Sequence, residues 1–540
     1  MTTGAQHIAR TLLRRGITLI ATRASLGTAP LHIAAQAANI TVVKMPDAAS
    51  VLRVADGAAR RKGRTSVALL DGHDDVQDAL GPWDEAVKAE TPILIIVSCT
   101  EEPSIAEEQR GRYTKERKTL AEDLRYCLQE AATSPSGPVL WYVNDEALQD
   151  DATDRLAGEN QVQVTHSDSG IEHVQLRRAA AMVDEAQRVL IWAGGGALRA
   201  QAGIEVAELA DRIGAPVITT IQAVGLLPAR HPCLVGLPPH LPAVGQLWDD
   251  ADLVIAIGSD FDHHQMQGGL MPAPNKMIAI NIDPDVGGTT YPPTVLLRGD
   301  AKIVTKALVA AVTYRGGTAA VRNRNEEIRR SSRAQLEETN PKDIELITAL
   351  GAAIPDRGLV VADWSLVGSW LADLHEWTMP RSLAMAAREG QTRWAVAAWV
   401  GAALGAWSAK DDQPIIGITG EQGVLANLGV LASLAAINTT NEQVPATLVV
   451  IDDGGFGRLR AHLAMAGAPS FPAEVPTPDI AALVRTLGLR ADRVNNVNEL
   501  TSALNVHLAT PDPTVLVVQT RPSLPASDAA VWYRRSNHAE

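Results

Sequence analysis

The chain is poor in cysteine and phenylalanine, with three residues of each among 540. The cysteines, Cys99, Cys127 and Cys233, are odd in number and far apart in the sequence. They match neither a disulfide framework nor the short spacings of a zinc motif. Because so few thiols fit a reducing compartment, the sequence predicts a cytoplasmic protein.

Long apolar runs and basic clusters are also missing. No stretch approaches the ~20 apolar residues that span a bilayer, and Met1 to Gly4 lack the charged-then-apolar order of a signal peptide. The net charge of −14 argues against a nucleic-acid groove. The one basic cluster, Arg60 to Lys62, is short, and we interpret it as the solvated end of a helix. We expect a small-molecule substrate and neither a membrane nor a nucleic-acid partner.

The composition suits packed α/β units. Hydrophobic residues make up 46% of the chain and charged residues 20%, so it can bury full cores. A chain of 540 residues is long enough for about three domains.

Short apolar runs alternate with helical stretches along the chain. Such runs are typical of strands buried on both faces of a parallel sheet, and the alternation predicts α/β domains. The strand candidates are 17–21, 66–70, 92–98, 188–193, 215–220, 253–258, 277–282, 359–363, 414–418, 446–451 and 514–519. The expected domains are 1–155, 171–315 and 342–525, and the polar segment 315–341 is expected to be an exposed helix and linker.

Two polar segments follow predicted strands of the third unit. Gly420 to Gly423 follows one strand, and Asp452 to Gly457 follows the next. Ligands of parallel sheets bind beyond the carboxyl ends of the strands. Glu421 and Asp453 offer the hard oxygen ligands that magnesium prefers.

A succession of motifs in the middle unit is similar to one family. In order, these motifs are Ala193 to Ala197, Gly214 to Val217, Ala251 to Gly258, Ile282 to Pro284 and Gly299 to Ala301. They resemble the central domain of acetolactate synthase-type enzymes that use thiamine diphosphate (ThDP). Ala55 to Gly63 and Pro478 to Gly488 resemble the outer domains. The resemblance implies three Rossmann-like, doubly wound parallel-sheet domains of pyrimidine-binding, central and diphosphate-binding type.

The resemblance also implies a site for ThDP and Mg²⁺. Glu421, Asp453 and the Gly455 carbonyl correspond to the family's metal ligands, although the family has Asp and Asn where this chain has the two acids. The positions that correspond to cofactor contacts are Gly390, Thr392, Gly420, Gln422, Gly423 and Gly457. Because the family's sites form between subunits, a homodimer or homotetramer is expected.

Several positions depart from the family pattern. The family's Glu on the aminopyrimidine ring corresponds to Ala48, and we interpret its neighbour Asp47 as a helix N-cap. A Gln-His pair at the diphosphate becomes Leu366-Val367. A bulky hydrophobe and the Gly after it become Thr392 and Arg393.

The family's Gly-Pro-Gly turn corresponds to Gly72-His73-Asp74, which places His73 and Asp74 near the cleft. The candidate catalytic groups are His73, Asp74 and Arg393. In the central domain, Gly258 to Asp262 is similar to the turn that contacts flavin in acetolactate synthases. Asp260 stands where those enzymes carry Arg, so the resemblance leaves FAD as a possible cofactor there.

Two hypotheses follow from the crowded acids. Without a cation, Glu421, Asp452 and Asp453 would repel one another, and the pKa of at least one would rise. If magnesium compensates them, the protein is a ThDP enzyme that acts on a 2-oxo acid or a 2-hydroxyacyl substrate. If Arg393 compensates them, the protein has abandoned ThDP, and it catalyses cofactor-free chemistry or serves as a non-catalytic subunit.

Overall fold

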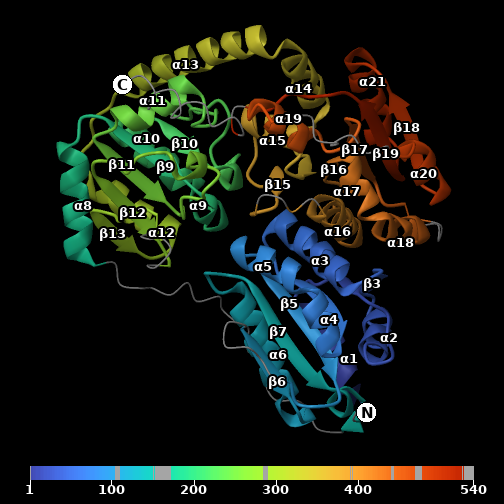
Figure 1. Cartoon of the computed structure of the whole chain (residues 1–540). Coiled ribbons are helices and arrows are strands. Elements are labelled where there is room, and N and C mark those ends of the chain that lie inside the picture. The colour runs from blue at the N-terminus through green and yellow to red at the C-terminus, as the bar shows by residue number, and fades with distance from the viewer. Residues whose placement is uncertain are drawn as a thin grey trace.

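The computed structural model describes residues 2–103, 110–149, 151–152, 172–283, 290–388, 391, 393–438, 443–468, 477–525 and 527. Three parallel sheets, each flanked by helices, make up the chain (Figure 1). The predicted α/β class with three Rossmann-like domains is therefore confirmed. None of the helices in the described part combines the length and apolar character that crossing a bilayer requires.

The N-terminal sheet has six parallel strands in the order β3-β2-β4-β5-β7-β6. Its strands are β2 (Leu19–Thr22), β3 (Thr41–Lys44), β4 (Ser66–Asp71), β5 (Ile93–Cys99), β6 (Gly111–Thr114) and β7 (Pro138–Asn144). The helices are α1 (Gly4–Arg14), α2 (Ala29–Ala37), α3 (Ala48–Lys62), α4 (Gly72–Asp78), α5 (Leu80–Lys88), α6 (Arg117–Ala132) and α7 (Asp145–Gln149). A separate antiparallel pair joins β1 (Thr2–Thr3) to β8 (Asp151–Ala152).

The central sheet has five parallel strands in the order β10-β9-β11-β12-β13. They are β9 (Val189–Ala193), β10 (Val217–Thr219), β11 (Leu253–Ile257), β12 (Met277–Asn281) and β13 (Val295–Arg298). The helices are α8 (His173–Glu185), α9 (Gly195–Arg199), α10 (Gly203–Ile213), α11 (Pro242–Asp250) and α12 (Ala301–Ala311), with short 3₁₀ turns η1 (Ile221–Ala223) and η2 (Gln267–Gly269).

A long helix, α13 (Thr318–Thr339), crosses over the central domain towards the C-terminal one (Figure 1). It covers most of the segment predicted to be an exposed helix and linker. Its polar side faces solvent, whereas Asn325, Ile328, Ser332 and Leu336 form a buried stripe. The stripe packs α13 onto both neighbouring domains, because α13 contacts α10 and α14 (Pro341–Ala353).

The C-terminal sheet has six parallel strands in the order β15-β14-β16-β17-β19-β18. They are β14 (Leu359–Ala362), β15 (Leu383–Met385), β16 (Ile415–Gly420), β17 (Ala446–Asp452), β18 (Arg490–Val494) and β19 (Pro513–Gln519). The helices are α15 (Leu366–Leu374), α16 (Trp394–Ser408), α17 (Glu421–Leu425), α18 (Leu428–Asn438), α19 (Gly457–Met465), α20 (Ile480–Thr486) and α21 (Val497–Leu508).

Helices α3 and α16 join the N-terminal and C-terminal domains (Figure 1). Two glycines allow the close approach: a Cβ on Gly57 would lie 2.0 Å from the Ala398 carbonyl oxygen, and a Cβ on Gly401 would lie 1.9 Å from the Val54 carbonyl oxygen. The sheets and the helices between them therefore lie in one continuous packed body.

The interpretation of Arg60 to Lys62 as a solvated helix end is wrong for its two arginines. Arg60 bridges Asp56 and Glu85 at 2.9 and 2.7 Å, with a side chain only 11% exposed. The guanidinium of Arg61 is buried and binds Asp411 at 2.7 Å. The role of Arg61 could not be predicted from the sequence, because Asp411 lies 350 positions further along the chain.

Two buried histidines lie where the central domain meets the C-terminal domain. Nε2 of His240 lies 3.0 Å from the His264 carbonyl oxygen, and the His264 ring stands edge-on to Trp364 at 4.8 Å. Burial is the main reason that the pKa of His240 falls to about 3 and that of His264 to about 4. Both side chains are therefore neutral at physiological pH.

Because these two histidines are neutral in the folded chain, we expect the chain to lose stability in acid. Their folded pKa values lie below the unfolded value, so the stability they give is present above about pH 6.5 and is lost as the pH falls towards 4. At pH 4, each histidine should lower the free energy of unfolding by up to about 3 kcal/mol. Urea unfolding at several pH values should show that His240→Gln flattens this fall. Parallel pH curves for the variant and the parent chain would contradict the assignment.

Candidate functional site

The two polar segments lie side by side at the carboxyl edge of the C-terminal sheet. Strands β16 and β17 are parallel neighbours, with Gly420 paired to Ile451. Helix α17 begins at Glu421, directly after β16, and the turn after β17 carries Asp453. The expectation that both segments share this edge is met.

Two carboxyl groups meet at this edge in a dry environment. Glu421 is 1% exposed, and its Oε1 accepts the Gly455 backbone N–H at 2.6 Å. Burial, followed by the charge of Asp453, raises the pKa of Glu421 to about 7. Burial also raises the pKa of Asp453. The pair therefore needs a cation before both groups can ionise near neutral pH.

Among the described residues, Arg460 and Arg493 form ion pairs with the acids of this edge. Arg460 Nη2 lies 3.7 Å from Asp453 Oδ1, and Arg493 Nη2 lies 3.7 Å from Asp452 Oδ2. The sequence reasoning missed both. Arg460 could have been noticed, because it lies one turn into the helix that follows the Asp453 turn, whereas Arg493 comes from a separate strand.

Arg393 does not play the counter-ion role expected of it. It is exposed at the start of α16, near Arg53 on α3, whose pKa is lowered mainly by burial and further by the charge of Arg393. Among the described residues, no hydrogen bond or ion pair joins Arg393 to Glu421 or Asp453. The hypothesis that Arg393 compensates the acids within its own chain is therefore wrong, since α16 carries it to the α3 interface.

The donor set at the edge fits Mg²⁺. The buried Asp453 Oδ1 accepts no hydrogen bond, and its 3.7 Å ion pair with Arg460 is long enough for a metal ion to displace. A Cβ at position 457 would lie 1.8 Å from Asp453 Oδ2, so any larger residue there would displace this carboxylate. A Cβ on Gly420 would meet nothing closer than 4.0 Å, so the space above this residue is open for a diphosphate. The oxygen ligands and the open space both suit a diphosphate-bound magnesium ion.

The other positions predicted to contact the cofactor or the metal differ in how well their surroundings suit that role. A Cβ on Gly423, in α17, would lie 2.0 Å from Thr419 Oγ1, so this glycine leaves room for the Thr419 side chain. Gln422 is half-buried. The Gly455 carbonyl oxygen accepts the Gly457 N–H at 2.8 Å, so it would have to share its lone pairs with a metal. Gly390 and Thr392 lie outside the described residues.

The predicted residues of the N-terminal domain form no shared cluster with these acids. His73 and Asp74 are exposed on α4, and His73 Nε2 lies 3.0 Å from Gln77 Nε2. Their buried neighbour Asp75, which pairs with Arg23 at 3.1 Å, went unnoticed in the sequence. Among the described residues, no hydrogen bond or ion pair links His73 or Asp74 to the carboxyl pair.

Ala48 leaves the expected acid position without a carboxyl group. It is 1% exposed in the first turn of α3. The prediction for its neighbour is confirmed, because Asp47 Oδ1 accepts the Ser50 N–H at 2.6 Å and caps the helix. Leu366 and Val367 are also buried, so hydrocarbon packing replaces polar contacts at that position.

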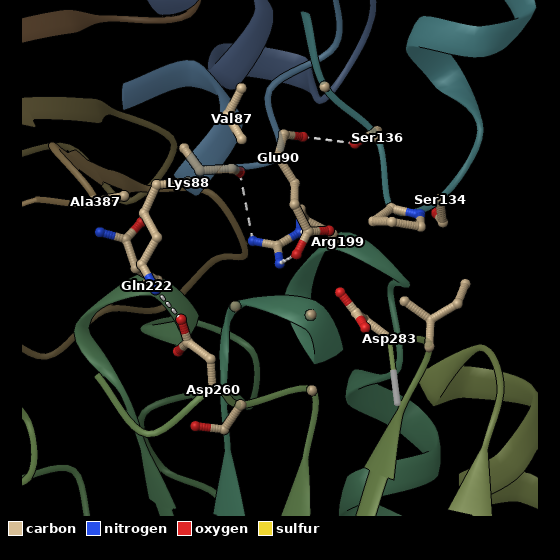
Figure 2. A pocket seen from close by; sticks show the side chains of 18 of the residues that line it. Val87, Lys88, Glu90, Ser134, Ser136, Arg199, Gln222, Asp260, Asp283 and Ala387 are labelled. Atoms are coloured by element: carbon tan, nitrogen blue, oxygen red, sulfur yellow. Dashed lines mark hydrogen bonds and ion pairs between the residues drawn. The ribbon is translucent and has the colours of Figure 1, made fainter. Parts of the chain in front are cut away.

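A cavity of about 530 Å³ lies at the junction of the three domains. Figure 2 shows two ion pairs on its wall, Lys88 with Asp260 and Arg199 with Glu90. Both pairs join the N-terminal domain to the central one. Asp260, which replaces the family's Arg, is therefore used in an interdomain contact.

The charges in this cavity do not fit FAD. The described lining residues include five acids and three cations; the acids are Glu90, Asp260, Asp262, Asp283 and Asp300, and the cations are Lys88, Arg110 and Arg199. Each of the three cations is already paired with a carboxylate. The diphosphate of a flavin dinucleotide would therefore meet excess negative charge without an uncommitted cation among these residues.

Comparison with known proteins identifies two domains of the chain. Residues 176–308 match the family described as thiamine pyrophosphate enzyme, central domain. Residues 364–518 match the family described as thiamine pyrophosphate enzyme, C-terminal TPP binding domain. Together the matches include the sheet edge that carries Glu421 and Asp453.

Similar proteins have related descriptions. The chain is 28% identical over 330 residues to a probable 2-ketoarginine decarboxylase of Pseudomonas aeruginosa, covering 60% of this chain and 56% of the relative. It is 25% identical over 383 residues to a probable acetolactate synthase large subunit of Methanococcus aeolicus, covering 65% and 61%. The matched parts therefore span less than two thirds of these relatives.

The fold similarity extends over nearly the whole chain. A solved benzoylformate decarboxylase from Polynucleobacter necessarius superposes with a TM-score of 0.78 at 17% identity, covering 97% of this chain and all of that one. At this identity the superposition shows a shared fold alone.

Proposed function

Because the chain belongs to the thiamine diphosphate-dependent, acetolactate synthase-like enzyme family, we propose that it binds ThDP and Mg²⁺ at the β16–β17 edge. There it would break or form the carbon–carbon bond next to the carbonyl of a 2-oxo acid or a 2-hydroxyacyl substrate. The descriptions of two similar proteins, a probable 2-ketoarginine decarboxylase and a probable acetolactate synthase large subunit, support this substrate class.

The observation that carries the proposal is the buried carboxyl pair. Glu421 and Asp453 directly follow neighbouring strands, and burial raises the pKa of both. Asp453 Oδ1 has no hydrogen-bond partner, and its ion pair with Arg460 is long, at 3.7 Å. A divalent cation bound to both would let them ionise and would hold the diphosphate over Gly420. ThDP, when bound, supplies the electron sink for the reaction.

The pyrimidine side of the proposed site would contribute packing rather than proton transfer. Ala48 has no group that can take a proton, and the Asp47 carboxylate is used as a helix cap. We therefore propose an atypical member of the family in which the metal end of the cofactor is held more strongly than the ring end.

A second function is favoured by one specific contact. Arg460 already places a guanidinium 3.7 Å from Asp453 Oδ1, so an internal cation stands beside the proposed metal ligand. If that contact persists in solution, it would replace magnesium, and the chain would act without ThDP or as a non-catalytic subunit.

We also propose that the chain forms a homodimer. Phe456, Leu459 and Met465 on or beside α19 are 44%, 43% and 46% exposed, and Leu26 in the N-terminal domain is 94% exposed. Phe456 and Leu459 lie one helical turn apart, and neighbouring exposed apolar side chains of this kind are typical of a surface that a partner covers. Sedimentation analysis should give twice the chain mass, and Leu459→Asp should shift it towards the monomer; a monomeric parent chain would contradict the proposal.

Activity can be tested with a panel of 2-oxo acids. Carbon dioxide release should require both ThDP and Mg²⁺ and should stop when EDTA removes the metal. Equal release without ThDP would favour the second function. Absence of release from every acid, with ThDP bound, would restrict the proposal to 2-hydroxyacyl substrates.

A further inference from the structure

Three side chains of different chemistry meet in the central domain, away from the β16–β17 edge. Asp211 lies in the last turn of α10, and His231 and Cys233 lie in the loop after η1. One ligand atom from each lies within 4.8 Å of the other two. Cys233 Sγ is 3.5 Å from Asp211 Oδ1, and His231 Nε2 is 3.7 Å from Asp211 Oδ2.

These separations suit a small tetrahedral ion. Zinc bonds of about 2.0–2.3 Å place neighbouring tetrahedral ligands roughly 3.3–3.8 Å apart. The two measured separations end on different oxygens of the Asp211 carboxylate, and one ligand atom from each residue lies within 4.8 Å of the other two. The three groups therefore need to move together by about 1 Å to hold a single ion. Thiolate, imidazole and carboxylate together also favour zinc over magnesium or calcium, which prefer oxygen ligands.

The loop that carries two of the ligands is rigidly held. The Cys233 carbonyl accepts the Val217 N–H at 2.8 Å and the Asn325 side-chain amide at 2.9 Å. Asn325 is fully buried on α13, which also contacts α10 through Thr318 and the Asp211 carbonyl at 3.3 Å. Because the loop and α10 are both fixed, the ligands are brought together before any metal arrives.

We propose that Asp211, His231 and Cys233 bind one Zn²⁺ ion, with water as the fourth ligand. Binding replaces the Cys233 S–H bond by a sulfur–zinc bond and releases that proton to solvent. His231 Nε2 becomes the imidazole ligand, and the ring proton moves to Nδ1. The 3.2 Å contact from the Cys233 N–H to Nδ1 is then given up. One long hydrogen bond costs about 1 kcal/mol, which is small beside the strength of a zinc–thiolate bond.

Without metal the same groups form a hydrogen-bonded cluster. Burial is the main reason that the pKa of the Cys233 thiol rises to about 12, so the thiol is protonated and donates to Asp211. The ion would join α10 to the loop beneath α13. It would therefore stabilise the helix that links the central and C-terminal domains.

Cobalt titration of the full chain tests the proposal. With excess Mg²⁺ present to occupy oxygen sites, Co²⁺ should produce a thiolate-to-cobalt charge-transfer absorption that saturates at one ion per chain, and Zn²⁺ should displace it. Cys233→Ser should abolish the band. Cys127→Ser, which removes a buried thiol from the N-terminal domain, should leave it unchanged and serves as the matched control.

A second variant keeps the test valid even if Cys233→Ser does not fold. His231→Gln keeps a polar side chain at a partly exposed position and should lower zinc affinity at least about tenfold. Zinc should raise the Tm of the parent chain and not that of either variant. Absence of a saturating band in the parent chain, or a band that survives Cys233→Ser, would overturn the proposal. Neither result would bear on ThDP binding, which uses other residues.

Discussion

Replacing Asp453 with alanine is expected to remove Mg²⁺-dependent ThDP binding. Asp453 supplies a buried oxygen that lacks a hydrogen-bond partner, and its loss would leave Glu421 as the one carboxylate of the pair. Because changes to groups that only orient metal ligands cost roughly 10–100-fold in affinity, loss of the ligand itself should cost about 100-fold or more. Calorimetric titration of ThDP at fixed Mg²⁺ measures the change.

Two asparagine variants distinguish the loss of a metal ligand from the loss of a negative charge. Asp453→Asn keeps an oxygen ligand and removes the like charge, so it should retain cofactor binding while the pKa of Glu421 falls towards its usual value. Asp452→Asn changes the neighbour that faces Arg493, and it should leave ThDP binding within a fewfold of the parent chain. Equal losses for Asp452→Asn and Asp453→Ala would contradict the assignment of the ligand.

Alanine at Gly57 or Gly401 is expected to destabilise the chain severely. Either Cβ would lie within 2.0 Å of a backbone carbonyl oxygen on the facing helix, so α3 and α16 would have to move apart. Overpacking of this kind should cost about 3 kcal/mol or more, which exceeds the ~1 kcal/mol gain in helix propensity. Urea unfolding gives the free energy directly.

Gly405 provides the matched control on the same helix. A Cβ there would lie 3.4 Å from the Ala58 Cβ, which is ordinary contact, so Gly405→Ala should be neutral or slightly stabilising. If all three variants unfolded alike, close helix approach would not explain the glycines at 57 and 401.

The sequence predicted the features that depend on local pattern. Buried strand runs and their alternation with helices gave the three parallel sheets, and strand ends placed Glu421 and Asp453 on one edge. The Asp47 cap was also predictable, since it requires only a short acidic residue before a helix. Each of these properties is set by residues a few positions apart.

Contacts between residues that are far apart in the sequence could not be predicted from it. Arg61 forms an ion pair with Asp411, and Lys88 forms one with Asp260, only because three domains pack together. The sequence offers magnesium and Arg393 as alternative counter-ions of the metal edge, but the arginine that lies beside Asp453 is Arg460. Local spacing distinguishes Arg460 alone, which lies one turn into α19; the direction of the other side chains follows from how their helices pack.

Titration of ThDP into the folded chain in the presence of Mg²⁺ tests the central claim most directly. We predict saturable binding of one cofactor per chain that disappears when EDTA removes the metal and in Asp453→Ala. Absence of binding at millimolar ThDP with Mg²⁺, by a chain shown to be folded, would contradict the proposed site and leave Arg460 as the cation of the carboxyl pair.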